Sequence, residues 1–123
     1  MTQGAGETLI ELGARRYHVD VKKVPGSFEL PIAAKLLIES AQYDAVIAIG
    51  SVIQGETRHF EFVCQAVAQG IKDVSLQTGV PVIFCVLTDD TLEQAKARSG
   101  GKHGNKGVEA AVAAVKMAYM KSQ

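Results

Sequence analysis

Two apolar segments on either side of one strongly periodic segment constrain the fold of this chain most. Residues 43–49 contain the run AVIAI and residues 80–87 read VPVIFCVL, so both are apolar at consecutive positions. Such runs are typical of strands that are covered on both faces in a parallel sheet. Between them, apolar residues recur at helical spacing, which predicts a helix that crosses from one strand to the next. These residues are Phe60, Val63, Cys64, Val67, Ile71 and Val74.

Four further helices and one further strand are predicted around this unit. Residues 7–16 read as an amphipathic helix and residues 19–24 as a short strand, which Pro25 stops because proline cannot donate to a ladder. Pro31 is expected where the next helix begins, and a short helix is expected around residues 91–97. A last helix follows, with a predicted apolar stripe. The stripe consists of Val108, Ala111, Val112, Val115 and Tyr119.

The alternation of strands and helices predicts an α/β fold, a three-layer αβα sandwich around a parallel sheet, as a single domain over residues 1–123. Thirteen basic and thirteen acidic residues cancel, so nothing indicates a nucleic acid or a membrane as a partner. The first residues lack the basic and apolar pattern of a secretory signal. Cys64 and Cys85 have no CxxC spacing, and the three histidines lack ligand spacing. We therefore expect a cytoplasmic protein with reduced thiols and no metal site.

The loop after residues 43–49 is the first candidate site. Ligands of open α/β sheets bind beyond the carboxyl ends of the strands, and here GSVIQGETRHF leads directly into a helix. Free N–H groups at a helix start suit an anion, so Gly55, Glu56 and Thr57 are predicted to bind phosphate. His59 follows in the first turn, where the dipole favours a neutral imidazole that could transfer protons. The alternative is a simple turn, an N-cap and a surface histidine.

Two other loops carry groups of interest. RSGGKHGNKG places Arg98, Lys102 and Lys106 among glycines, but it lacks the context of a Walker loop or a dinucleotide fingerprint. Arg98 could hold a phosphate through two parallel hydrogen bonds. In PGSFELP, Phe28 could stack on a flat ring and Glu29 could accept hydrogen bonds from hydroxyls. Equally, these two residues could cap the core and the next helix.

Together, four segments resemble the successive signature segments of the lumazine synthase family, in the same order and at similar intervals. They are VPGSFELPIAAK, YDAVIAIGSVIQGETRHFEFV, GVPVIFCVLTDDTLEQAKAR and GGKHGNKGVEAA, within about residues 19–120. The combination of GET-x-HF with the later R-x-G-x-K-x-GNKG is specific. The resemblance implies a flavodoxin-like parallel sheet whose usual first strand is missing from this sequence. Gln54 stands where the family commonly has Arg, Arg58 where Pro is frequent, and Cys85 where Gly is common.

The resemblance also implies a reaction in riboflavin biosynthesis, its penultimate step, that needs no metal or organic cofactor. Enzymes of this family are transferases that condense 5-amino-6-(D-ribitylamino)uracil with 3,4-dihydroxy-2-butanone 4-phosphate. The products are 6,7-dimethyl-8-ribityllumazine, phosphate and water. The family forms pentamers, in some members assembled into an icosahedral 60-subunit capsid, and riboflavin synthase is a candidate partner.

Site residues follow from the resemblance position by position. His59 would move protons, and Gly55, Glu56, Thr57 and Arg98 would hold the phosphate. The ribitylaminouracil would be held by several positions, of which Phe84 would come from the neighbouring subunit. These positions are Ser27, Phe28, Glu29, Ser51, Val52, Ile53, Phe84 and Lys106.

Two other functions stay open at this stage. One is a non-catalytic, shell-forming relative, which the missing first strand suggests. The other is a flavodoxin-like module that binds flavin or phosphate, suggested by fold class alone. The presence of both His59 and Arg98 favours the enzyme, because a shell would need neither residue.

Overall fold

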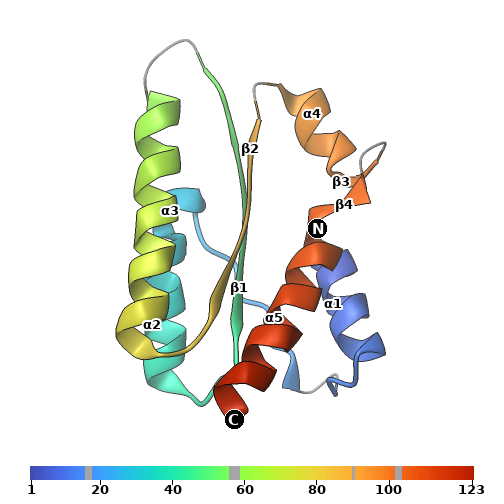
Figure 1. Ribbon diagram of the computed structural model, residues 1–123. Coiled ribbons are helices and arrows are strands. Elements are labelled where there is room, and N and C mark those ends of the chain that lie inside the picture. The colour runs from blue at the N-terminus through green and yellow to red at the C-terminus, as the bar shows by residue number, and fades with distance from the viewer. Residues whose placement is uncertain (16–17, 56–58, 90, 102–103) are drawn as a thin grey trace.

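The computed structural model describes residues 1–15, 18–55, 59–89, 91–101 and 104–123. Two parallel strands form the central layer, with helices on both sides (Figure 1). The strands are β1 (Val46–Ile53) and β2 (Val82–Asp89). One side is covered by α2 (Leu30–Ser40) and α3 (His59–Thr78). The other side carries α1 (Thr2–Glu11), α4 (Leu92–Ala97) and α5 (Lys106–Ser122). This arrangement confirms the predicted α/β sandwich.

The centre of the fold is the unit β1–α3–β2, whose two strands run parallel from the pair Val46 and Val82 to the pair Ile53 and Asp89. Its main core lies between the sheet and the helices α2 and α3. The buried members are Leu30, Ala34, Ala48, Val67, Ile71, Val74, Val82 and Val86. The helical periodicity of α3 and the two-sided apolar strands therefore predicted the real core.

Both predicted strands end later than expected. β1 continues through Ser51, Val52 and Ile53, which the sequence placed in a loop. These residues stay in the strand because they pair with Leu87, Thr88 and Asp89 of β2. An apolar run shows which residues are covered, but it does not show where the hydrogen-bonded ladder stops.

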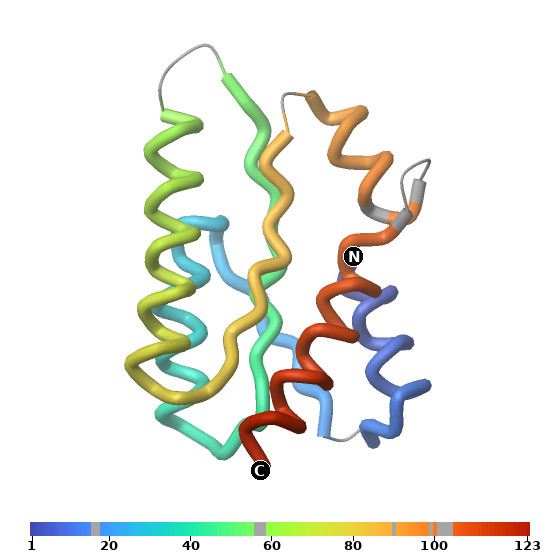
Figure 2. Tube along the Cα trace, in the orientation of Figure 1, coloured from blue at the N-terminus to red at the C-terminus, as the bar shows by residue number. Residues whose placement is uncertain are grey.

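The predicted strand at residues 19–24 is wrong. These residues form no ladder; instead they pass behind the sheet, from α1 towards a short 3-10 helix, η2 (Ser27–Glu29) (Figure 2). A groove of about 390 Å³, lined by residues 22–24, by α2 and by residues 46–48, lies between this segment and β1. A strand needs a neighbour that pairs with its N–H and C=O groups. Among the described residues, β2 is the only strand beside β1.

The first helix lies earlier than its predicted position at residues 7–16. It ends at Glu11, because Gly13 takes a left-handed φ of 111° that stops the helix. It starts near Thr2 despite two glycines, because it packs on α5 and buries Ala5. A Cβ at Gly4 would lie 2.5 Å from the side chain of Asn105, so glycine permits this close packing.

The last helix buries a different stripe from the predicted one. Val108 and Tyr119 are 38% and 68% exposed, and of the predicted stripe only Ala111 is fully covered. The covered residues of α5 are Gly107, Ala110, Ala111 and Ala114. Small side chains let this helix approach α1 and the sheet closely, which a count of bulky apolar residues does not detect.

The predictions for the remaining helices are confirmed. Pro31 lies in the first turn of α2, and α3 stops directly before Gly79, whose φ is 72°. Thr91 caps α4, because its hydroxyl accepts a hydrogen bond from the backbone N–H of Gln94 over 3.2 Å. In the part of the chain described here, we find no helix with the length and apolar character needed to cross a membrane.

Candidate active site

The carboxyl ends of the two strands meet at one edge of the sheet. Ile53, the last residue of β1, lies opposite Asp89, the last residue of β2. The backbone N–H of Gln54 donates to the carbonyl oxygen of Asp89 over 3.0 Å. The loop that contains Gly55 therefore starts directly beside the end of β2. Glu56, Thr57 and Arg58 lie outside the described residues.

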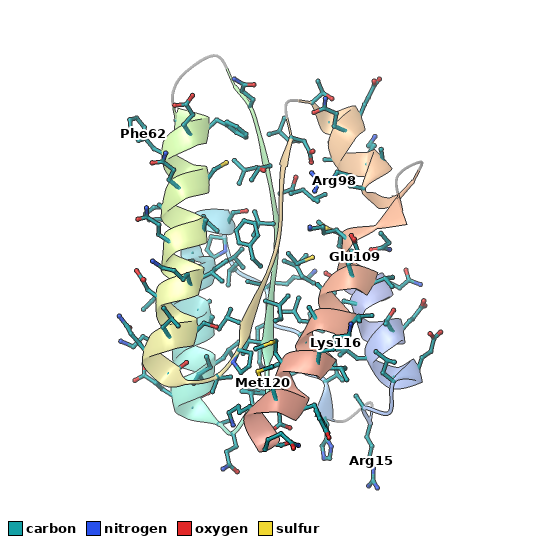
Figure 3. The ribbon with its side chains drawn as sticks, in the orientation of Figure 1. Arg15, Phe62, Arg98, Glu109, Lys116 and Met120 are labelled. Carbon is teal, nitrogen blue, oxygen red and sulfur yellow. The ribbon has the colours of Figure 1, made fainter. Side chains whose placement is uncertain are left out.

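Arg98 is held at this same edge by an ion pair. Its Nη1 lies 3.1 Å from Oδ1 of Asp89, and the two side chains are 40% and 7% exposed, respectively. Figure 3 shows the Arg98 side chain between the C-terminal end of α4 and the end of β2. A guanidinium has five N–H donors, so this single contact leaves others for an anion.

Asp89 is a residue that sequence reasoning did not assign to the site. The segment TDDT follows the last predicted strand, and such a position is where ligands of parallel sheets bind. That position was the available signal. The sequence could not show that α4 turns back and brings Arg98 onto Asp89, because the two residues lie nine positions apart on different elements.

Lys106 is placed by the backbone that leads into α5. Its N–H donates to the carbonyl oxygen of Arg98 over 2.8 Å, and the side chain of Asn105 caps the helix by accepting from the N–H of Gly107 over 2.9 Å. Burial raises the pKa of the Cys85 thiol, and the positive charge of Lys106 partly opposes this rise. Lys106 therefore stands close enough to β2 to act on a thiol in the middle of that strand.

The 3-10 helix η2 brings the other expected substrate contacts to β1. The hydroxyl of Ser27 donates to the carbonyl oxygen of Ser51 at 3.4 Å. A Cβ at Gly50 would lie 2.5 Å from this hydroxyl oxygen, so glycine at position 50 gives Ser27 its place. Phe28 projects with 63% of its surface exposed, and Glu29 is half-buried. Ser27 and Ser51, predicted to act together, are thus in contact.

The structure places Phe84 and Lys106 on opposite sides of the sheet. Phe84 lies in the middle of β2, 38% exposed, on the face of the strand that also carries Val82 and Val86. That face packs on α2 and α3, whereas Lys106 begins the helix on the opposite side of the sheet. His59 is the first residue of α3 and is exposed.

The described residues contain no group of three or more His, Cys, Asp and Glu side chains that could hold a metal ion. Both cysteines are free thiols: Cys85 is buried and Cys64 is half-buried.

Comparison with known proteins gives consistent matches over nearly the whole chain. The profile of a family described as 6,7-dimethyl-8-ribityllumazine synthase matches residues 1–122. A protein of that name from Christiangramia forsetii is 57% identical over 120 residues, which are 97% of this chain and 71% of the relative. Its namesakes from Flavobacterium johnsoniae and Flavobacterium psychrophilum are 57% and 55% identical. Both matches extend over 98% of this chain, but over only 63% and 64% of the two relatives, respectively.

Proposed function

Because this chain belongs to the 6,7-dimethyl-8-ribityllumazine synthase family, we propose that it catalyses the condensation that gives the family its name. It joins 5-amino-6-(D-ribitylamino)uracil to 3,4-dihydroxy-2-butanone 4-phosphate and releases phosphate and water. The amine of the uracil substrate is itself the nucleophile, so the protein needs no nucleophilic Ser or Cys. Its task is to orient two substrates and to move protons.

The observation that carries this proposal is the position of Arg98. The ion pair with Asp89 keeps the guanidinium at the carboxyl end of β2, and the Gln54–Asp89 backbone bond brings the Gly55 loop to the same place. We assign the phosphate of the butanone substrate to Arg98 together with Gly55, Glu56 and Thr57. Apart from its two chain neighbours, no described residue has an atom within 4 Å of the position of a Cβ at Gly55, so the described part of the site leaves an anion room to approach that backbone.

We assign the ribitylaminouracil to the residues around η2 and the end of β1. Ser27, Phe28 and Glu29 would contact it from η2, and the backbone of Ser51, Val52 and Ile53 from β1. Lys106 would reach it from the start of α5. The contact between Ser27 and Ser51 supports this grouping. His59, at the start of α3, would move protons during imine formation, phosphate elimination and ring closure.

We assign Phe84 to the site of a neighbouring subunit. Phe84 and Lys106 lie on opposite faces of the sheet, so within a single chain the two side chains do not contact the same substrate ring. This supports the assignment. Exposed large apolar side chains, among them Phe28, Phe62 and Tyr119, supply surface that association would cover. We propose a pentamer as the basic assembly, and an icosahedral shell with enclosed riboflavin synthase as the larger assembly. We also propose that the protein works in the cytoplasm, where its free thiols stay reduced.

The test is to mix both substrates with the protein and to follow lumazine fluorescence, with His59→Ala and Arg98→Ala beside the wild type. Arg98→Ala should mainly raise the KM for the butanone phosphate. His59→Ala should lower kcat by about 10²-fold, as expected for a general acid–base group. Sedimentation of the same samples gives the state of assembly.

Three results would contradict the proposal or part of it. Intact wild-type oligomers that form no product would indicate a non-catalytic, shell-forming relative. Tight binding of flavin mononucleotide without turnover would indicate a flavin-binding module instead. Equal activity of the wild type and both variants would remove His59 and Arg98 from the mechanism.

A further inference from the structure

We infer that Asp89 is the positioning residue for Arg98: its carboxylate fixes one edge of the guanidinium so that the other N–H donors face the phosphate of the substrate. This inference rests on the proposed function and adds a residue to it. It is drawn from the contacts, burial and charges at the end of β2.

The backbone of Asp89 is fixed by the sheet. Asp89 is the last residue of β2 and lies opposite Ile53, and its carbonyl oxygen accepts from the N–H of Gln54 over 3.0 Å. Its position relative to the Gly55 loop is therefore set by ladder hydrogen bonds rather than by side-chain packing. A group attached to Asp89 is held at a constant place beside that loop.

The side chain of Asp89 extends this fixed point to Arg98. It is 7% exposed, and its Oδ1 accepts from Nη1 of Arg98 at 3.1 Å. A buried carboxylate is costly unless it is paired, so this contact holds both partners strongly. Arg98 itself stands at the C-terminal end of α4, a helix of six residues, which by itself gives a long flexible side chain little support.

The contact uses only part of each group. Oδ2 of Asp89 is buried and has no hydrogen-bond partner among the described residues. The pair is thus held at one oxygen and one terminal nitrogen, and Arg98 keeps 40% of its side chain exposed. This arrangement orients the guanidinium without consuming its donors, as a residue that must also bind phosphate requires.

The hollow beside the pair is suited to a small anion only if Asp89 is neutralised. It has a volume of about 490 Å³ and is lined by Asp89, Glu93, Gln94, Ala97 and Arg98. Two of these residues are acidic, and both would repel a phosphate. The Arg98 contact offsets the charge of Asp89, whereas Glu93 is exposed and screened by water. Asp89 therefore acts through Arg98 and not by direct contact with substrate.

The decisive comparison is between Asp89→Asn and Asp89→Leu. The two replacements share the same branched arrangement of heavy atoms, but only the amide keeps an oxygen that can accept from Nη1 of Arg98. We expect Asp89→Leu to raise the KM for the butanone phosphate about tenfold or more, with the KM for the ribitylaminouracil changed less than about twofold. Asp89→Asn should restore most of the affinity. Glu39→Gln, which removes an exposed charge near the end of α2 and outside the assigned site, should leave both KM values within about twofold.

A second measurement separates this inference from the proposed function. Binding of inorganic phosphate to the intact protein, followed by calorimetry, does not depend on turnover. Wild type and Asp89→Asn should bind phosphate more tightly than Asp89→Leu, and Asp89→Leu should have no further effect in an Arg98→Ala background. If the wild type forms no lumazine but this pattern holds, only the proposed function fails.

The inference is overturned if Asp89→Leu binds phosphate and the butanone phosphate as tightly as the wild type does. It is also overturned if Asp89→Asn and Asp89→Leu are equally impaired for both substrates while their thermal unfolding is lowered in parallel, because that pattern marks a purely structural residue. Should Asp89→Leu not fold, Asp89→Ser, with a hydroxyl too short to reach Arg98, answers the same question.

Discussion

The backbone N–H of Lys106 donates to the carbonyl oxygen of Arg98 over 2.8 Å, which joins the start of α5 to the end of α4. Between these two residues, β3 (Ser99–Gly101) and β4 (Gly104–Asn105) pair in antiparallel fashion. The glycine-rich segment thus folds back on itself and sets two cations at a fixed spacing. Since the bond uses only backbone atoms, either side chain can be replaced without removing it.

Lys106→Met should therefore separate the two substrates. The methionine keeps much of the length of the side chain and the backbone bond to Arg98, but it removes the ammonium group assigned to the uracil substrate. We expect the KM for the ribitylaminouracil to rise about tenfold, the usual order for a lost hydrogen bond to a charged group. The KM for the butanone phosphate should stay within about twofold. An equal rise in both values, measured by lumazine fluorescence, would contradict the assignment.

Gly50→Ala should disturb η2. The added methyl would lie 2.5 Å from Oγ of Ser27 and 3.1 Å from Cδ1 of Leu30, so both must shift. We expect a loss of about 1–3 kcal/mol in the free energy of unfolding, as for other overpacked sites, and a higher KM for the ribitylaminouracil. Gly6→Ala is the matched control, because Gly6 lies in α1 with nothing within 4 Å of its Cβ position. The control should be neutral or stabilised by up to about 1 kcal/mol.

Gly55→Ala should affect binding and not folding. A methyl at Gly55 meets no atom of the other described residues within 4 Å, and the φ of Gly55 lies outside the left-handed region, so we expect the fold to accept alanine. Such a methyl would crowd a ligand that lies close to that backbone. We expect urea unfolding to be unchanged within about 0.5 kcal/mol or slightly stabilised, and the KM for the butanone phosphate to rise several-fold. Unchanged KM with unchanged stability would place the phosphate elsewhere.

The sequence predicted those features that depend on residues close together along the chain. The two-sided apolar strands, the stripe of α3, Pro31 in α2 and the short helix near residues 91–97 all depend on local spacing. Such patterns reflect what each segment must bury, whichever partner buries it. They gave the α/β sandwich and placed the loop with Gly55 at the carboxyl edge of the sheet.

The features that sequence missed depend on partners distant in the chain. Residues 19–24 have strand-like composition, but the described residues offer them no strand to pair with. Gly4 of α1 leaves room for the side chain of Asn105. The Asp89–Arg98 pair depends on the direction in which α4 turns back after β2. No periodicity within one element contains that information, so polar pairs of this kind emerge only from the folded arrangement.

Cys85 provides a test of the environment beside Lys106. The thiol is fully buried in the middle of β2, and burial raises its pKa above the ordinary value of 9.0, although the charge of Lys106 partly opposes the rise. The raised pKa belongs to the folded state, so the unfolded chain releases this proton first as pH rises. The stability contributed by the neutral thiol is therefore fully present below about pH 9 and is lost as pH rises through the folded-state pKa.

We accordingly expect the free energy of unfolding, measured with urea, to fall more steeply above about pH 9 in the wild type than in Cys85→Ala. The comparison is needed because burial also raises the pKa of Cys64 and a hydrogen bond to Asp20 raises that of Tyr43; both groups are present in the two proteins. In Lys106→Met one opposing charge is gone, so the pKa of Cys85 should rise further and the difference from a matched Cys85→Ala variant should grow. A difference curve that is flat with pH in both backgrounds would show that Cys85 titrates like a thiol in water and that Lys106 does not act on it.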